Sequence, residues 1–377
     1  MNAGGYLRPV WRGGSRDAST DNQSVEFAGA CPGRRVIARD CDAAVRHPYL
    51  GPVVDAWEAW AVDSEIRYKA SSGGTLTALV SFLVGTGGYR SATAASSAPD
   101  PRRTVSVEIT TKAEAIAAAG SRYAPVAAAG SCDLDGGSET AVVGKPCEVS
   151  AVRQLLELRS QDRRPLLLSF FCAGTPSQLA TDDLLEDLGL AESEQLTALR
   201  YRGHGWPGDF SAKSVDGRSV TTGYNDSWGR RLGPTTQWRC KICPDGVGES
   251  ADITAGDFWH ADENGYPDFS NKEGVSVLIA RTVRGREVIQ KAFDAKIIAG
   301  RPINLDDVSR VQPLQTKRRI TLAGRMIGTV LALNRVPRYS GFGLFRLSWI
   351  SPSIALRAIP GTFIRALKMR RSQQGLN

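Results

Sequence analysis

Two cysteines three positions apart are the clearest chemical feature of this 377-residue sequence. Cys240 and Cys243 form a Cys-x-x-Cys pair. Pro244 and Gly246 follow, and these residue types keep the next stretch out of helix, as a ligand loop requires. Two such thiolates can bind one metal ion or part of an iron–sulfur cluster. Either centre usually takes four protein ligands, so the sequence must supply two more.

Two further cysteines each follow a short apolar stretch. Residues 140–143 read as a buried strand, and a tight turn after them leads through Cys147 into a predicted helix. Residues 166–171 read as a second strand that runs directly into Cys172. Residues at the carboxyl ends of parallel strands collect at one edge of a sheet. If the two strands are neighbours, these thiols face one crevice and can complete the four ligands.

A turn of small residues precedes an apolar segment of helical length at 75–84. It consists of Ser71, Ser72, Gly73 and Gly74. Free backbone amides at a helix start can bind a phosphate group, and the helix dipole favours the anion. The same residue types also serve as ordinary N-caps and turns. The spacing leaves both interpretations open.

A cation and an aromatic residue follow the end of a second helix, predicted at 111–119. They are Arg122 and Tyr123, preceded by Ser121. One interpretation is a clamp on a nucleotide, and the other is a surface arginine beside a packed tyrosine. The spacing does not decide between them.

The remaining pattern predicts an α/β (α+β) fold, with a mixed sheet, flanking helices, an irregular N-terminal segment and a basic C-terminal tail. Residues 85–104 are rich in Gly, Ala, Ser and Pro and predict a surface loop. The predicted segments are an irregular one at 1–53, two domains at 54–135 and 136–310 with the cysteines in the second, and a basic helical tail at 311–377.

Charge is concentrated at the C-terminal end. The net charge is +8, and from Arg310 onward there are thirteen Lys or Arg and no Asp or Glu, which leaves the rest of the chain at −5. This asymmetry argues against nucleic-acid binding by the whole protein. The tail mixes aromatics, aliphatics and cations as an interfacial membrane helix does. The alternative is a basic helix that packs on the acidic body or on a partner subunit.

Composition also indicates the compartment. The sequence starts without the apolar region of a secretory signal, and no apolar run reaches about 18 residues. Seven cysteines without a signal argue against a disulfide framework. We expect a cytoplasmic protein, with peripheral membrane contact as the alternative that the tail allows.

Five motifs in order resemble one family, the coenzyme F420 hydrogenase/dehydrogenase beta subunits, whose relatives include formate dehydrogenase beta chains and a hydroxymethyl-chlorophyll reductase. The resemblance covers roughly residues 50–300. The motifs are Ser71-Ser72-Gly73-Gly74, Gly120-Ser121-Arg122-Tyr123, Gly144-Lys145-Pro146-Cys147, Phe171-Cys172-Ala173-Gly174, and Cys240-x-x-Cys243 with its trailing ADITAGDFW.

The resemblance implies an oxidoreductase that carries FAD and a [4Fe–4S] cluster, in which electrons pass between them and a soluble carrier such as coenzyme F420 or ferredoxin. The 54–135 domain would then be the flavin side. By motif, the cluster ligands are Cys147, Cys172, Cys240 and Cys243. By motif, the FAD-binding residues are Ser71, Ser72, Gly73, Gly74, Ser121, Arg122, Tyr123, Gly144 and Lys145. Many members begin with a cysteine-rich ferredoxin-like segment that this sequence lacks, so we expect another chain to supply that relay or the relay to be absent.

Other functions remain open. A structural zinc site is the main rival for the four cysteines, although zinc more often takes two Cys-x-x-Cys pairs. A second alternative is a degenerate, non-catalytic member with a structural metal site that acts in assembly or polysaccharide biosynthesis. The motifs of P-loop proteins, serine hydrolases and standard dinucleotide-binding domains are absent from the sequence.

Overall fold

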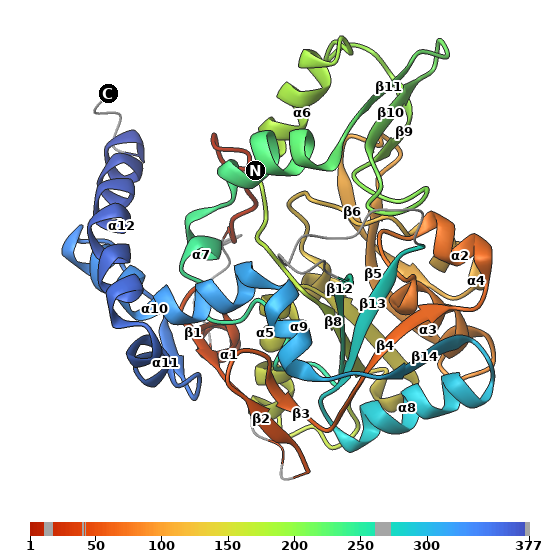
Figure 1. The fold of residues 1–377 in the computed structure, drawn as a ribbon, viewed down its shortest axis with the longest axis horizontal. Coiled ribbons are helices and arrows are strands. Elements are labelled where there is room, and N and C mark those ends of the chain that lie inside the picture. Colours follow the sequence, from red (N-terminus) through yellow and green to blue (C-terminus); the bar gives the residue numbers. More distant parts are fainter. Residues whose placement is uncertain (11–17, 40, 42, 261–272, 374–377) are drawn as a thin grey trace.

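Eight strands form one mixed sheet at the centre of the structure (Figure 1). The computed structural model describes residues 1–10, 18–39, 41, 43–260 and 273–373. In their order across the sheet, the strands are β14 (Ile298–Pro302), β4 (Asp55–Ala61), β13 (Val275–Ala280), β12 (Ile253–Phe258), β8 (Leu166–Phe170), β7 (Thr140–Gly144), β5 (Ser91–Ser97) and β6 (Thr104–Ile109). The four strands from β12 to β5 run parallel, and the outer pairs are antiparallel.

Helices cover both faces of this sheet. One face carries α2 (Ser64–Lys69), α3 (Thr75–Gly85), α4 (Lys112–Ala117) and α8 (Val283–Asp294), and the other carries α5 (Pro146–Leu158) and α9 (Leu305–Val311). Side chains alternate along a strand, so Leu166 and Leu168 of β8 join the core under α3 and α8, whereas Leu167 packs under α5. The predicted mixed α/β sheet with flanking helices is therefore confirmed.

A smaller antiparallel sheet stands beside the main one (Figure 1). It contains β9 (Leu196–Arg200), β10 (Phe210–Ser214) and β11 (Ser219–Thr222), accompanied by α6 (Gln178–Asp187) and a π-helical segment, η3 (Asn225–Leu232). Tyr201, Phe210 and Leu232 form its core together with leucines of α6. Arg202, which follows β9, and Trp228 of η3 line the same cavity as Phe170 at the C-terminal end of β8, so this unit covers that edge of the main sheet.

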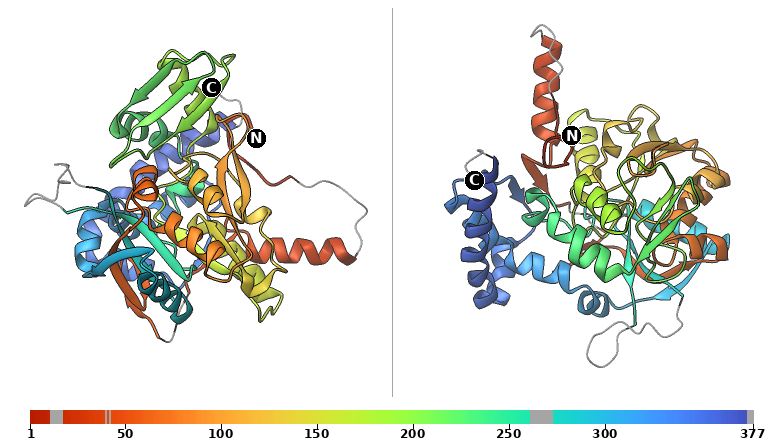
Figure 2. Two further views of the ribbon diagram at one scale, coloured as in Figure 1. Left: turned by 90° about the vertical axis from the view of Figure 1, so that its right-hand side faces the viewer. Right: turned by 90° about the horizontal axis from the view of Figure 1, so that it is seen from above.

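A strand from the first forty residues of the chain pairs with one from the last forty. β1 (Arg35–Ile37) pairs in parallel with β15 (Arg338–Ser340), and β2 (Val45–His47) pairs with β3 (Gly51–Val53). The remaining elements are α1 (Ala18–Ala30), α7 (Trp238–Lys241), α10 (Pro313–Leu331), α11 (Leu344–Ile350), α12 (Pro352–Gln373) and the short turns η1 (Ala128–Gly130), η2 (Gly137–Glu139) and η4 (Gly233–Thr235). Figure 2 shows α10 to α12 grouped at the outer edge of the molecule.

The structure differs from the sequence-based expectation at one strand of the main sheet. The composition of residues 85–104 predicts a surface loop, but β5 lies there as one of the parallel strands, so this prediction is wrong. Its small residues Ala92 and Ala94 are buried in the core with α3. Small side chains allow this helix to lie close to the strand, but they also resemble loop composition.

Two further points concern the predicted segments. The segments at 54–135 and 136–310 both contribute strands to the main sheet, since β4 lies between β14 and β13. The segment 1–53, in its described part, contains α1 and three short strands. None of the helices in the described ranges combines the length and apolarity that crossing a membrane requires.

Candidate functional site

The two strand-end cysteines lie where the pattern predicts. β7 and β8 are parallel neighbours, with Gly144 opposite Ser169, so Cys147 in the first turn of α5 and Cys172 after β8 leave the same sheet edge. The turn at Lys145 begins α5 with a Pro at the first helical position, which a helix start accepts. The condition on which the shared crevice depended is therefore met.

The Cys-x-x-Cys loop docks directly on this edge. The backbone N–H of Thr175 donates to Cys240 Sγ at 3.4 Å, and the N–H of Cys172 donates to the Gly246 carbonyl at 2.8 Å. Gly174 has φ +137°, and a Cβ on it would lie 3.1 Å from the Cβ of Cys240. Only a residue without a side chain fits there comfortably.

The four cysteine side chains share one electrostatic environment. Arg239 donates to Cys147 Sγ at 3.9 Å. Burial alone would lower the pKa of the Arg239 guanidinium, but Cys147, Cys240 and Cys243 raise that pKa. Burial and the thiols of Cys240 and Cys147 raise the pKa of Cys172 to about 12. The Cys172 thiol is therefore protonated at neutral pH, and a bound metal would be needed to hold it as a thiolate.

The described residues do not form a preassembled site for one metal ion. Among the residues that the structure describes, no three His, Cys, Asp or Glu side chains come close enough to hold one metal ion. Four thiolates on one zinc ion would have sulfurs within about 4 Å of each other, since each Zn–S bond is about 2.3 Å. Four cysteine thiols are the donor set of both structural zinc sites and iron–sulfur clusters. The residue types therefore fit either centre.

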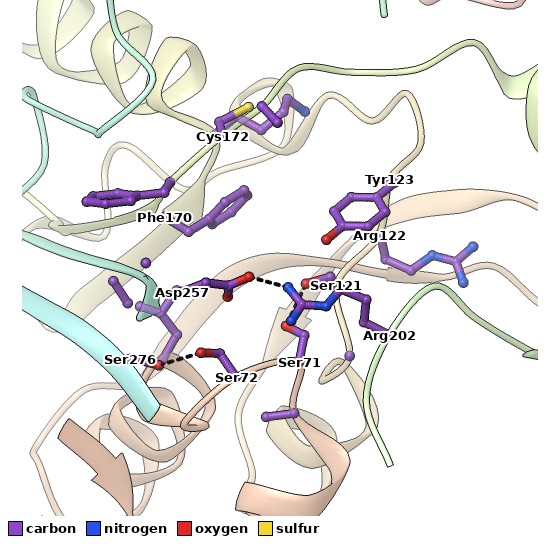
Figure 3. A pocket seen from close by; sticks show the side chains of 18 of the residues that line it. Ser71, Ser72, Ser121, Arg122, Tyr123, Phe170, Cys172, Arg202, Asp257 and Ser276 are labelled. Carbon is purple, nitrogen blue, oxygen red and sulfur yellow. Dashed lines mark hydrogen bonds and ion pairs between the residues drawn. The ribbon is translucent and has the colours of Figure 1, made fainter. Parts of the chain in front are cut away.

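A cavity of about 540 Å³ opens beside the cysteines, a size typical of small-molecule and cofactor sites. Cys172 lines it on one side, opposite Ser71 and Ser72 (Figure 3). Of the nine residues predicted to contact a cofactor, all except Gly73 line this cavity. Residues that are far apart in the sequence thus meet around one space.

The N-terminus of α3 faces the cavity with unused hydrogen-bonding capacity. Gly74 adopts a left-handed conformation, φ +75°, and no side chain caps the helix. The Thr75 hydroxyl is buried and has no partner in the structure, and Thr75 lines the cavity. A Cβ on Gly73 would come within 2.6 Å of the Ala59 carbonyl oxygen, so only glycine allows this approach. An uncapped helix start with an unpartnered hydroxyl suits an anionic group such as a phosphate.

The neighbouring serines close this end of the cavity. Ser71 Oγ and Ser121 Oγ are 2.7 Å apart, and Ser276 Oγ donates to Ser72 Oγ at 3.3 Å (Figure 3). These contacts tie the turn before α3 to the residues after α4 and to β13. The two serine motifs, 50 positions apart, therefore form one wall.

Arg122 turns away from the cavity (Figure 3). Its guanidinium donates to the Leu199, Pro101 and Arg103 carbonyls at 2.8 to 3.0 Å and to the Thr104 hydroxyl at 3.0 Å. This geometry matches the interpretation of Arg122 as a structural arginine, although Arg122 is among the residues that line the cavity. Tyr123 is directed toward the cavity and lies against Trp228, with ring centroids 4.7 Å apart.

Lys145 lies between the cavity and the thiols. Its Nζ donates to the Val126 carbonyl at 2.9 Å and is 3.0 Å from a Glu148 carboxylate oxygen. Burial alone would lower its pKa, but Glu148 and Cys147 raise it, so the ammonium stays charged. A fixed positive charge at this position favours negative charge on either side.

The sequence reasoning missed an ion pair in the cavity wall. Arg202 pairs with Asp257, and its Nε donates to the Pro207 carbonyl at 2.9 Å (Figure 3). Gln312 Nε2 donates to the Asp257 carbonyl at 2.7 Å. Asp257 belongs to the ADITAGDFW stretch, but Arg202 lies in a region whose pattern shows only strands and turns. Gln312 lies in the segment interpreted as a tail, so its sequence carried no signal.

Comparisons with known proteins agree with the fold and the motif order. Two family models match, both described as coenzyme F420 hydrogenase/dehydrogenase, beta subunit: the N-term model covers residues 56–131, and the C terminus model covers residues 137–305. The coenzyme F420 hydrogenase beta subunit of Methanococcus voltae is 27% identical over 272 residues, which cover 69% of this chain and 87% of that protein. The corresponding protein of Methanosarcina barkeri is 25% identical over 276 residues, covering 69% and 85%.

Solved structures share this fold, and one of them illustrates the similarity. It is a chain of the F420-reducing [NiFe] hydrogenase complex from Methanosarcina barkeri, studied with xenon, with a TM-score of 0.57 and 23% identity. The match covers 78% of this chain and 98% of that one. This chain therefore belongs to the coenzyme F420 hydrogenase/dehydrogenase beta-subunit family, and membership implies a part in redox or electron-transfer chemistry.

Proposed function

We propose that this chain is an iron–sulfur flavoprotein and an oxidoreductase. FAD would occupy the 540 Å³ cavity, and Cys147, Cys172, Cys240 and Cys243 would hold a [4Fe–4S] cluster beside it. The observation that carries the proposal is the position of Cys172, which lines the cavity and also lies within the electrostatic environment of the other thiols.

The flavin part of the proposal rests on the α3 end of the cavity. A dinucleotide cofactor carries a pyrophosphate, and the uncapped helix start with the unpartnered Thr75 hydroxyl supplies donors for it. Trp259 also lines the cavity, and its indole N–H is buried without a partner. Both unsatisfied donors would gain an acceptor from a bound polar ligand, which removes the cost of leaving them unpaired.

The cluster part rests on the donor set and its surroundings. Four thiols lie at one loop-rich sheet edge, where they influence one another and the Arg239 guanidinium. Arg239, Lys145 and Arg318 all lower the pKa of one or more of these thiols. Such cations favour thiolate ligands and the added negative charge of a reduced cluster.

Bound FAD supplies both hydride and single-electron chemistry. The residues of the chain would orient it and exclude water. Phe170, Phe171 and Trp259 line the cavity, and their aromatic side chains help to exclude water from it. Lys145 keeps its proton at Nζ and holds a fixed charge there. The carrier that exchanges electrons with this site is proposed to be soluble, either coenzyme F420, which the names of the relatives contain, or ferredoxin.

An anaerobic spectrum of the purified chain tests the proposal. We expect absorption bands of both flavin and iron–sulfur cluster, with about one FAD and four iron atoms per chain. Reduction should then follow on addition of reduced coenzyme F420 or reduced ferredoxin, with NADPH as the comparison. A folded protein that takes up neither iron nor flavin after anaerobic reconstitution would rule the proposal out and favour a non-catalytic role. A colourless protein with one zinc ion would favour the structural metal site.

A further inference from the structure

The C-terminal helices expose an unusual share of the large apolar side chains. Of the 24 exposed large apolar residues in the described ranges, eleven lie from Leu314 onward. They include Trp349, 79% exposed, and Phe345, 69% exposed. α11 and α12 lie at the edge of the molecule away from α8 (Figure 1), and neither contributes a residue to the cavity wall.

The exposed side of α11 combines aromatic, aliphatic and cationic side chains. Phe345, Arg346, Trp349 and Ile350 all point to solvent. At about 100° per residue they cover one continuous arc of the helix. Leu347 is buried on the opposite side. The large aromatic residues of α11 therefore face outward although the helix has a buried face available.

α12 likewise buries small side chains and exposes larger apolar ones. Ala355, Thr362 and Ala366 are buried, whereas Leu356 and Ile364 are exposed. Small residues on the buried side allow α10 and α12 to approach closely, so the larger apolar ones remain outside. An exposed apolar stripe beside a well-packed face indicates a surface that contacts something else.

The charges beside these apolar residues have one sign. Arg346, Arg357 and Lys368 are exposed on α11 and α12. No Asp or Glu occurs after residue 310, so nothing acidic within the segment neutralises them. A binding partner must therefore offer an apolar region for these side chains and negative charge beside it for the cations.

We propose that the outer side of α11 and α12 binds an anionic lipid surface. Phe345, Trp349, Leu356 and Ile364 would enter the headgroup boundary, while the arginines and Lys368 contact lipid phosphates. Trp and Phe on one side of a cationic helix are the features of helices that lie in a membrane interface.

Vesicle sedimentation with the full chain tests this proposal without any redox assay. Two probes are needed: phosphatidylcholine vesicles and vesicles of phosphatidylcholine with an equal part of phosphatidylglycerol. We expect pelleting only with the anionic vesicles, and loss of binding at about 0.5 M salt, where charges are strongly screened. Arg346→Gln with Arg357→Gln should weaken partitioning about fivefold per arginine. Phe345→Ser with Trp349→Ser should weaken it at least as much.

Phe27→Ser is the matched control, because Phe27 is an exposed aromatic residue on α1, outside this surface. It should leave vesicle binding unchanged. The proposal would be overturned if the same fraction of the wild type pelleted with both vesicle types. A wild-type dimer that Phe345→Ser with Trp349→Ser converts to a monomer would also overturn it, since the surface would then bind a second copy. Neither result bears on FAD or iron content, so the redox proposal is tested separately.

Discussion

Arg318 of α10 donates a hydrogen bond from Nη1 to the main-chain oxygen of Cys172 at 3.0 Å. Its Nη2 donates to the Ala173 carbonyl at 2.9 Å. Gln315, one turn earlier, donates to the same Cys172 oxygen at 3.4 Å. A helix beyond residue 305, where the family match ends, therefore holds the strand-end cysteine segment.

The first prediction concerns this arginine. Arg318→Gln removes two hydrogen bonds from a buried cation and one positive charge near Cys172 and Cys243. We expect the free energy of unfolding to fall by about 1–3 kcal/mol. Under the proposed function, the reduction potential of the cluster should also become more negative, because a nearby cation favours the reduced state. Urea unfolding and anaerobic potentiometry measure the two effects.

Arg325→Gln is the matched control on the same helix. Arg325 donates to the Lys241 carbonyl at 3.0 Å, so it holds the Cys240–Cys243 loop rather than the segment at Cys172. It should destabilise the fold but leave the potential nearly unchanged. Equal potentials in wild type and Arg318→Gln would contradict a direct electrostatic effect and leave Arg318 a purely structural role.

The second prediction separates the proposed ligands from the other cysteines. Cys172→Ser and Cys243→Ser should each abolish the iron–sulfur absorption and lower the iron content to well below one cluster per chain. Cys132→Ser is the control, because Cys132 packs near η1, donates to the Ala129 carbonyl at 3.2 Å, and burial raises its pKa to about 11. It should retain full iron content. Unchanged iron in Cys172→Ser would sink the ligand assignment.

The third prediction concerns flavin affinity. Thr75→Val keeps the side-chain shape but removes the unpartnered hydroxyl at the start of α3. We expect FAD to bind about fivefold more weakly, from the loss of roughly 1 kcal/mol of hydrogen bonding. The protein without flavin should become slightly more stable, because a buried polar group without a partner is removed. Flavin titration by fluorescence and thermal unfolding measure these opposite effects.

Ser81→Ala on the same helix provides the comparison. Its hydroxyl is also buried without a partner, but Ser81 does not line the cavity. The stability of the flavin-free protein should rise as in Thr75→Val, while the FAD affinity stays that of the wild type. If both variants bind FAD equally well, the Thr75 hydroxyl has no role toward the cofactor.

The strand-end cysteines could be predicted because they depend on local pattern. A short apolar run followed by a turn identifies a buried strand, and parallel pairing then brings Cys147 and Cys172 together. β5 could not be predicted in this way, since its alanines carry little strand signal and become core residues only against α3.

The direction of individual side chains could not be predicted from the sequence either. Arg122 occupies a motif position, but three carbonyls and a hydroxyl brought together by β6 and β9 draw its guanidinium away from the cavity. The charge distribution predicted a single basic tail at residues 311–377. In the structure, Arg319 of that segment is buried against Glu249, and Gln312 contacts Asp257. A net charge averages over such positions, so it gives no information on which cations are buried.

The fourth prediction concerns the close contact between α10 and α12. Gly324 faces α12 so closely that a Cβ would overlap the Ala355 carbonyl oxygen, and a Cβ on Gly328 would come within 2.5 Å of the Ile359 carbonyl. Backbone oxygens of a packed helix cannot move aside as a flexible side chain does. Gly324→Ala should therefore lower the free energy of unfolding by about 1–3 kcal/mol. It should also expose α12 to proteolysis before the central sheet unfolds.

Gly361→Ala, inside α12, should have the opposite sign. The nearest atom to its Cβ would be the guanidinium of Arg365 at 3.3 Å, the mobile end of a long side chain. Alanine stabilises a helix interior by about 0.5–1 kcal/mol relative to glycine. Urea unfolding of the two variants, followed by limited proteolysis at the C-terminal end, measures the contrast. If Gly324→Ala proves as stable as Gly361→Ala, α10 and α12 can move apart without a loss of unfolding free energy. The close contact at Gly324 and Gly328 then does not hold α12 in place.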